Sequence, residues 1–156
     1  DAFDAAMIAG AMTVEAARAS ASPFAEELQA VRGQPGQIAV AGKLRALLAG
    51  SAIMDSHRNC GKVQDPYCLR CMPQVMGSCR DFMDFTAAVL LREANAVSDN
   101  PLVFTGPDRV LSGGNFHAEP VAMVADTLAL VIAELASLAE RRIAMTPTGE
   151  IGAITP

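Results

Sequence analysis

The sequence VQDPYCLRCMP, residues 63–73, joins a turn to the start of a helix, and the rest of the chain is organised around it. Asp65-Pro66 is a turn signal, and Pro73 suits the first position of a helix because its missing N–H would have no partner there. The segment therefore predicts a short loop that runs directly into a helix. If this loop winds one turn, Tyr67 and Arg70, three positions apart, point into the same space.

A long amphipathic helix is predicted to follow at residues 73–96. Its apolar residues repeat at helical spacing, and charged residues largely fill the other side. These apolar residues are Val75, Met76, Cys79, Phe82, Met83, Ala87, Leu90, Leu91 and Ala94. Asn100-Pro101 helps to stop the helix, and residues 97–116 are expected to form a turn and a small β-hairpin, with strands at 102–104 and 109–111.

A second long helix is predicted at residues 117–145, with apolar residues around nearly its whole circumference. They include Val121, Val124, Leu128, Leu130, Val131, Ile132, Leu135 and Leu138. A helix of this kind must be buried by neighbours on every side. The chain supplies few other long helices, so we expect burial against partner subunits or further polypeptide. The tail at 146–156 is turn-prone.

Residues 1–50 predict several short helices, because the apolar pattern is interrupted at Thr13, at Ser22-Pro23 and at Gly33. The helix after Gly33 is expected to end at Gly50. Residues 51–62 are polar and irregular, so 51–72 is expected to be a loop that carries the site. The whole chain is thus predicted to be mainly α, a single helical fragment of a long-helix bundle with a small β-hairpin.

Composition excludes several classes of protein. Of the 156 residues, 51% are hydrophobic and 19% are charged, which predicts a globular chain. The net charge of −5 argues against a nucleic-acid partner, because phosphate contacts need clustered Lys and Arg. Asp126 and Glu134 interrupt the most apolar segment, so no membrane partner is expected. Four cysteines are few for a disulfide framework, which favours a reduced, cytoplasmic location.

The chemistry of the 63–73 segment suits a carboxylate ligand. A phenol can pass a proton, and an arginine fork can hold a carboxylate through two parallel hydrogen bonds. Tyr67 and Arg70 would therefore suit an amino-acid substrate. Spacing alone leaves open the alternative of a buried tyrosine and a structural arginine that bond to backbone. Likewise, His117 and Glu119 could act as an acid–base pair, but a helix cap is the favoured interpretation.

The cysteines raise the possibility of a metal site. Cys68 and Cys71 form a Cys-x-x-Cys pair flanked by Cys60 and Cys79, with His57 nearby, and thiolates at such spacing can bind zinc. A single Cys-x-x-Cys is a weak signal, and Cys79 falls on the apolar face of the first long helix, where a thiol behaves as a small hydrophobe. No metal is therefore expected, and nothing matches a nucleotide-binding loop.

Four segments, in order, resemble the histidine ammonia-lyases of the aromatic amino acid ammonia-lyase family. They are residues 63–71 (VQDPYCLRC), 73–77 (PQVMG), 93–104 (EANAVSDNPLVF) and 111–120 (LSGGNFHAEP). The resemblance covers most of residues 1–145 and corresponds to a central part of the enzyme. It implies a mainly helical, tetrameric lyase with long helices in a central bundle, in which the second long helix would be buried.

The resemblance also implies a reaction and a set of site residues. The full enzyme would eliminate ammonia from L-histidine to give urocanate, without a metal or an external cofactor. Its electrophile would be a methylidene-imidazolone ring (MIO) that forms from an Ala-Ser-Gly segment of the backbone. Tyr67 would orient the reacting amino acid, Arg70 would bind its carboxylate, Gln64 and Asn100 would line the pocket, and Phe116 would pack beside the ring.

Two departures from the family pattern matter. No Ala-Ser-Gly triplet occurs in the 156 residues, so this chain alone is not expected to be active, and Cys68 stands where the family usually has serine. Two alternatives stay open at this point. One is the same chemistry on phenylalanine or tyrosine, or an aminomutase outcome, and the other is a non-catalytic helical assembly subunit with structural or zinc-binding cysteines.

Overall fold

The computed structural model describes residues 1–58, 61, 63–106 and 108–145, and it is mainly helical with one two-stranded hairpin, as predicted. The chain divides into two compact units. Among the described residues, the first consists of those within Asp1–Asp81 and of Val131–Met145, and the second consists of those within Phe82–Leu130. The predicted loop and the two cavities described below belong to the first unit.

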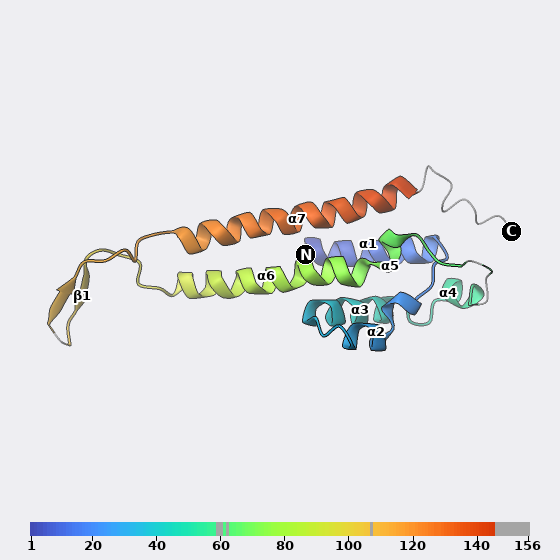
Figure 1. The fold of residues 1–156 in the computed structure, drawn as a ribbon, viewed down its shortest axis with the longest axis horizontal. Coiled ribbons are helices and arrows are strands. Elements are labelled where there is room, and N and C mark those ends of the chain that lie inside the picture. Colours follow the sequence, from blue (N-terminus) through green and yellow to red (C-terminus); the bar gives the residue numbers. More distant parts are fainter. Residues whose placement is uncertain (59–60, 62, 107, 146–156) are drawn as a thin grey trace. The chain divides into compact units, whose positions relative to one another are not determined.

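Short helices, together with parts of the two long helices described below, build the core of the first unit. Figure 1 shows the course of these helices. The short helices are α1 (Ala2–Ala16), η1 (Ser22–Phe24), α2 (Glu26–Ala30), α3 (Pro35–Leu48), α4 (Ala52–Ser56) and α5 (Tyr67–Arg70). α3 packs against α1, α2 and η1, and α5 packs against α1. The core includes the fully buried side chains of Met7, Val14, Phe24, Leu44, Leu69, Met72 and Met76.

Two sequence expectations for this unit are wrong. The predicted break at Thr13 does not occur, because its hydroxyl donates to the Ala9 carbonyl at 2.7 Å and is satisfied inside the continuous helix α1. The segment after Gly50 is not wholly irregular. The Ser51 hydroxyl accepts the Met54 N–H at 3.3 Å and so caps α4. A serine at the N-cap was the signal for this helix.

The two long helices fall close to their predicted bounds. α6 is Met72–Ala94, so Pro73 lies in its first turn, and α7 is Glu119–Met145. His117 Nδ1 accepts the Glu119 N–H at 3.1 Å. This contact confirms the capping interpretation of His117.

Within this chain α7 is buried along one line only. Its buried apolar residues, Val124, Val131, Leu138 and Met145, recur every seven positions, the period of a helix that packs through a single seam. Other apolar residues of α7 are exposed, among them Leu130 at 70% and Ile132 at 66%. The chain therefore does not itself provide burial on every side, which stays a prediction about further polypeptide or partners.

The same helix is long and apolar enough to cross a membrane by length and composition. A helix from the core of a soluble protein meets that test equally well. The charged residues Asp126 and Glu134 lie within it. A single such helix is weak support for a membrane span, so the expectation of no membrane partner stays a prediction.

Two glycines allow α3 and α6 to cross at backbone contact. A methyl group added at Gly77 would overlap the backbone of Gln37, and one added at Gly36 would overlap the Gly77 carbonyl oxygen. The Gly36 N–H, which lies in the first turn of α3, donates to the Asp81 carboxylate of α6 at 2.8 Å. Asp81 thus satisfies one of the donors that a helix start leaves open.

A chain of buried amides joins η1, α2 and α3. The Gln37 side-chain NH₂ donates to Gln29 Oε1 at 2.7 Å, and the Gln29 NH₂ donates to the carbonyls of Pro23 at 2.9 Å and Ala25 at 3.0 Å. Gln29 and Gln37 are almost fully buried. These bonds hold Pro23, which lines both cavities described below, against the core.

We predict that Gln29→Ala lowers the free energy of unfolding by about 2–3 kcal/mol, because it leaves buried polar partners unsatisfied. Urea denaturation of the protein measures this change. Gln34→Ala is the matched control, because Gln34 is exposed at the start of α3 and its side chain makes no cap bond. Equal midpoints for the two variants would contradict the role of the buried amides.

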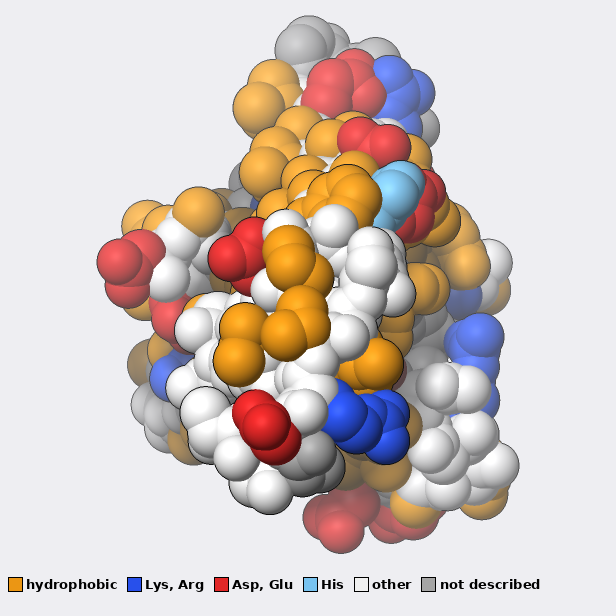
Figure 2. Space-filling view, turned by 90° about the vertical axis from the view of Figure 1, so that its left-hand side faces the viewer, with side chains coloured by type: hydrophobic (Ala, Val, Ile, Leu, Met, Phe, Trp, Pro, Cys, Tyr) orange, Lys and Arg blue, Asp and Glu red, His pale blue; other side chains and the backbone are white. Residues whose placement is uncertain are grey.

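The second unit carries the predicted hairpin. β1 (Leu102–Phe104) pairs antiparallel with β2 (Arg109–Leu111), with Val103 opposite Val110. Several of its apolar side chains are exposed, including Val103 at 68% and Val110 at 62%. Figure 2, viewed from the side that carries the hairpin, shows hydrophobic side chains at the surface among polar ones.

Candidate active site

The predicted loop ends in a single helical turn, α5, that one buried residue anchors. Pro66 precedes the turn, and its carbonyl accepts the Leu69 N–H at 3.1 Å. The Leu69 side chain is 2% exposed and belongs to the core, whereas Tyr67 is 69% exposed. Because Leu69 fixes the inner side of the turn, Tyr67 and Arg70 are directed outward from the core.

Tyr67 and Arg70 share one space, as their spacing predicted. The Arg70 guanidinium carbon lies 5.4 Å from the centroid of the Tyr67 ring, within the range of a cation–π contact. The alternative of a buried tyrosine is wrong, because most of the Tyr67 side chain is accessible. A phenol and a cation therefore stand together at the surface of the first unit.

Arg70 retains donors for a ligand. Its Nε donates to the Asp65 carbonyl at 2.9 Å. Among the residues that the structure describes, no carboxylate lies within ion-pair distance of the guanidinium, and Nη1 and Nη2 have no hydrogen-bond partner. Two parallel N–H groups are the arrangement that binds a carboxylate through two hydrogen bonds.

A cavity of about 500 Å³ lies in front of this pair and is the candidate site. It is lined by Ser22, Pro23, Leu28, Arg32, Tyr67, Arg70, Cys71 and Gln74. Arg32 adds a second guanidinium. Gln74 Oε1 is buried and has no partner in the described part of the chain, so a ligand polar group could satisfy it.

Sequence reasoning missed Arg32 and Gln74 as lining residues. Gln74 follows Arg70 by four positions, the spacing of neighbours on one helical face, and this was the signal that could have found it. Arg32 precedes the turn at Gly33, and no local pattern relates it to a loop that lies far along the chain.

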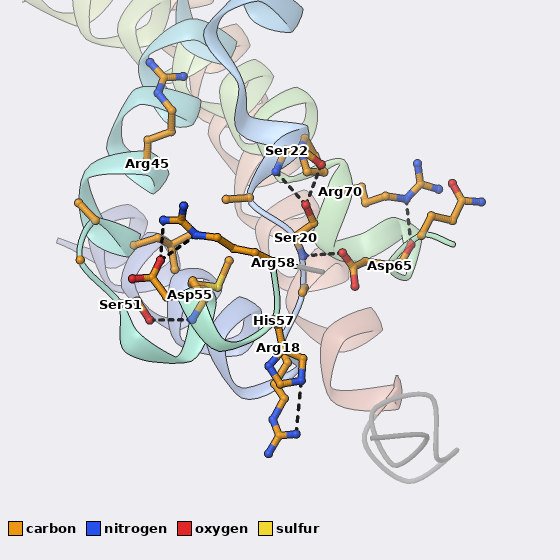
Figure 3. Close-up of a pocket in the computed structure, with 18 of the residues that line it drawn as sticks. Arg18, Ser20, Ser22, Arg45, Ser51, Asp55, His57, Arg58, Asp65 and Arg70 are labelled. Atoms are coloured by element: carbon orange, nitrogen blue, oxygen red, sulfur yellow. Dashed lines mark hydrogen bonds and ion pairs between the residues drawn. The ribbon is translucent and has the colours of Figure 1, made fainter. Parts of the chain in front are cut away.

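A second cavity, of about 630 Å³, also borders Arg70 (Figure 3). Gln64 lines this cavity and not the one that Tyr67 lines. Its wall is rich in cations, but several already have partners. Arg58 pairs with Asp55 at 2.7 Å, and Arg45 donates to the Phe24 carbonyl at 2.6 Å.

The other two predicted site residues belong to the second unit. Asn100 Oδ1 accepts the Gly113 N–H at 2.7 Å and the Ser112 hydroxyl at 3.0 Å. Asn100 therefore holds the glycine turn that precedes Phe116, and the Phe116 ring is 61% exposed. The structure thus groups Gln64, Tyr67 and Arg70 in one unit, and the convergence of Asn100 and Phe116 with them stays a prediction.

The cysteines of the described chain are thiols. Cys68 is half-buried, and Cys71 and Cys79 are buried, while Cys60 lies outside the described residues. Over residues 1–58, 61, 63–106 and 108–145, no group of three or more His, Cys, Asp or Glu is arranged to hold a metal ion. Burial raises the pKa of the Cys79 thiol, and the charge of Glu134 raises it further.

We predict that Cys71 is a slow nucleophile, because burial, followed by the neighbouring Cys68, raises the pKa of its thiol. Iodoacetamide labelling at pH 7.5, followed peptide by peptide in a mass spectrometer, should be at least about tenfold slower than in urea-unfolded protein. The raised pKa also means that this thiol contributes stability below the unfolded value of about 8.5 and loses it as pH rises through the folded value. Labelling at the unfolded rate would contradict the prediction.

Comparison with known proteins identifies the family to which this helical chain belongs. The family model for aromatic amino acid lyases matches residues 1–153, so the chain belongs to the aromatic amino acid lyase family. It is 58% identical to the histidine ammonia-lyase of Aromatoleum aromaticum over 99% of its own length, and 57% identical to that of Burkholderia multivorans over 100%. The chain spans 29% and 31% of the lengths of these two relatives.

Solved structures agree with this assignment. Histidine ammonia-lyase from Trypanosoma cruzi matches 89% of the chain with a TM-score of 0.78 and 41% identity, and the match covers 25% of that protein. Tyrosine aminomutase from Streptomyces globisporus matches 99% of the chain with a TM-score of 0.88 and 32% identity, and the match covers 33% of that protein. The predicted helical lyase fold is therefore confirmed.

Proposed function

We propose that the polypeptide to which this chain belongs is an ammonia-lyase that converts L-histidine into urocanate and ammonia. The observation that carries the proposal is Arg70, whose two terminal nitrogens have no partner among the described residues and which lies beside Tyr67 on one cavity. The identities of 58% and 57% to histidine ammonia-lyases favour histidine as the substrate.

In this proposal Arg70 binds the carboxylate of the amino acid. Its Nε already donates to the Asp65 carbonyl, so the N–H groups of Nη1 and Nη2 would donate to the two carboxylate oxygens. Fixing the acid end holds the amino group and the β-carbon in one orientation, which lowers the entropic cost of the elimination. Arg32, on the same cavity, would add to the positive potential that attracts the carboxylate.

Tyr67 would act on the reacting end of the substrate. Its hydroxyl can donate or accept a hydrogen bond, and its exposed ring would cover one side of the bound amino acid. In the elimination the bond from the α-carbon to nitrogen breaks and a proton leaves the β-carbon, so the products are urocanate and ammonia. Gln64 and Asn100 are proposed as polar lining residues of the complete site.

The proposed electrophile is an MIO group, which activates the amino group as a leaving group. No Ala-Ser-Gly triplet occurs in the sequence, so residues outside this chain would form it. The residues present fit such a planar group, because Phe116 exposes its ring after a turn that Asn100 holds. No further external cofactor is part of the proposal.

We further propose a homo-oligomer, a tetramer by resemblance, in a reduced, cytoplasmic location. The exposed apolar residues of α7 support burial against other polypeptide. The reduced setting is proposed because four cysteines are few for a disulfide framework. Sedimentation of the complete protein measures the oligomeric state, and a monomer would count against the proposed homo-oligomer.

The function is tested on the complete polypeptide, with L-histidine, L-phenylalanine and L-tyrosine as separate substrates. We expect urocanate, followed by its ultraviolet absorbance, from L-histidine at a kcat/KM well above those for the other two. Cinnamate or coumarate as the main product would show that the protein is a phenylalanine or tyrosine ammonia-lyase instead. A β-amino acid product would favour an aminomutase, a class to which the chain is similar in structure at a TM-score of 0.88.

A non-catalytic assembly subunit is the remaining candidate. It is distinguished by elemental analysis of the same purified protein. Stoichiometric zinc together with no turnover of any of the three amino acids would favour the subunit over the enzyme.

A further inference from the structure

We infer that Asp65 is the positioning residue that sets the direction of the Arg70 fork, an inference that rests on the proposed carboxylate-binding role of Arg70. Asp65 is 7% exposed, and it forms hydrogen bonds with two different segments of the chain. Its side chain binds Ser20, and its main chain binds Arg70.

The first contact fixes the loop to a distant segment. Asp65 Oδ2 accepts the backbone N–H of Ser20 at 2.6 Å, across 45 positions of sequence (Figure 3). Ser20 is in turn bound to Ser22, because their hydroxyls lie 2.7 Å apart and the Ser22 N–H donates to the Ser20 hydroxyl at 3.1 Å. Ser22 lines the candidate cavity together with Arg70. Asp65 therefore connects the loop that carries Arg70 to a second segment that lines the same cavity.

The second contact orients the guanidinium. The Asp65 carbonyl accepts the Arg70 Nε–H at 2.9 Å, and this bond leaves Nη1 and Nη2 as the pair that faces a ligand. The position of that carbonyl depends on the side-chain bond to Ser20, because both belong to one residue. A displacement of the loop by about 1 Å would misplace both terminal nitrogens, which can cost a large factor in binding and rate.

The bond to Ser20 depends on how far the side-chain acceptor of residue 65 reaches. Asn has an acceptor oxygen at the same reach as Asp, so Asp65→Asn keeps the bond to Ser20, whereas Glu is longer by one methylene and must displace the loop. Ala removes the acceptor. Among the three variants, Asn should therefore be closest to the parental enzyme.

The test uses the complete enzyme with L-histidine as substrate. We expect Asp65→Ala to raise KM about tenfold with kcat within about threefold, because carboxylate binding contributes to ground state and transition state alike. Asp65→Asn should stay within about twofold of the parental KM, and Asp65→Glu should raise it about fivefold. The Glu variant retains an acidic acceptor, so its KM still tests the inference if the Ala variant does not fold.

A double-mutant cycle separates positioning from general stabilisation. In an Arg70→Ala background, Asp65→Ala should change KM by less than about twofold, because the group through which it acts is gone. Asp81→Ala is the matched control. Its carboxylate also accepts one backbone N–H, from Gly36 at 2.8 Å. That variant should lower the thermal midpoint and leave KM parental.

The outcomes separate this inference from the proposed function. An unchanged KM for Asp65→Ala, a parental KM for Asp65→Glu, or the same increase in both arms of the cycle would overturn the inference while activity of the parental enzyme upholds the function. A parental enzyme that turns over none of the three amino acids would overturn the proposed function and this inference with it.

Discussion

Arg70→Ala should raise KM for the amino acid by about 10–100-fold in the complete enzyme, the equivalent of a charge-assisted hydrogen bond of about 1.5–3 kcal/mol. The terminal nitrogens of Arg70 are the donors that the described residues leave without partners, and Tyr67 lies against the same guanidinium. In the proposed reaction the carboxylate would be bound both before and during the elimination, so most of the loss should fall on KM. Steady-state kinetics with L-histidine provide the measurement.

Two further variants sharpen this prediction. Arg70→Lys keeps the charge but not the planar fork, so its KM should fall between those of the parent and the Ala variant. Arg58→Ala is the control for loss of a cation nearby, because Arg58 is already paired with Asp55 at 2.7 Å. Its KM should be parental. If Arg70→Ala left both KM and kcat unchanged, Arg70 would not belong to the site.

Gly77→Ala should destabilise the first unit by about 3 kcal/mol, although alanine is the better helix former. In an open helix position this substitution stabilises by about 0.5–1 kcal/mol. At Gly77, however, the added methyl group would overlap the backbone of Gln37, and backbone cannot rotate away as a side chain can. α3 and α6 would have to separate, which would also weaken the bond from Gly36 to Asp81.

Gly42→Ala is the matched control for this sign reversal. Gly42 lies inside α3, and its added methyl group would come no nearer than 3.8 Å, to the end of the Arg45 side chain. Chemical denaturation should therefore show a small gain for Gly42→Ala and a large loss for Gly77→Ala. A gain for both variants would mean that the helices can move apart at little cost.

The sequence predicted the parts of the fold that local pattern determines. The period of apolar residues located α6 and α7, and Asn100-Pro101 followed by the two short runs at 102–104 and 109–111 located the hairpin. The prediction at Thr13 failed because a mid-helix threonine can satisfy its hydroxyl within the helix, at the Ala9 carbonyl. Pattern alone does not distinguish that threonine from one that starts a helix.

The parts that sequence could not predict depend on contacts between distant segments. Asp65 was interpreted as a turn residue, yet its carboxylate is buried on the backbone of Ser20, 45 positions away. The sequence places Gly77 inside a helix and gives no further information about it. Glycine is required there because the backbone of Gln37 occupies the space that a side chain would need. The Tyr67–Arg70 pair was predictable because three positions in one turn fix its geometry without help from the rest of the chain.

The single buried seam of α7 has a practical consequence. Leu130, Ile132 and Ile143, each at least 66% exposed, give this helix a large water-facing apolar area when the 156 residues are considered by themselves. Surfaces of this kind drive proteins to associate non-specifically. Produced in isolation, the fragment should precipitate or form heterogeneous aggregates, so the experiments on Arg70, Asp65 and Gly77 need expression of the entire polypeptide.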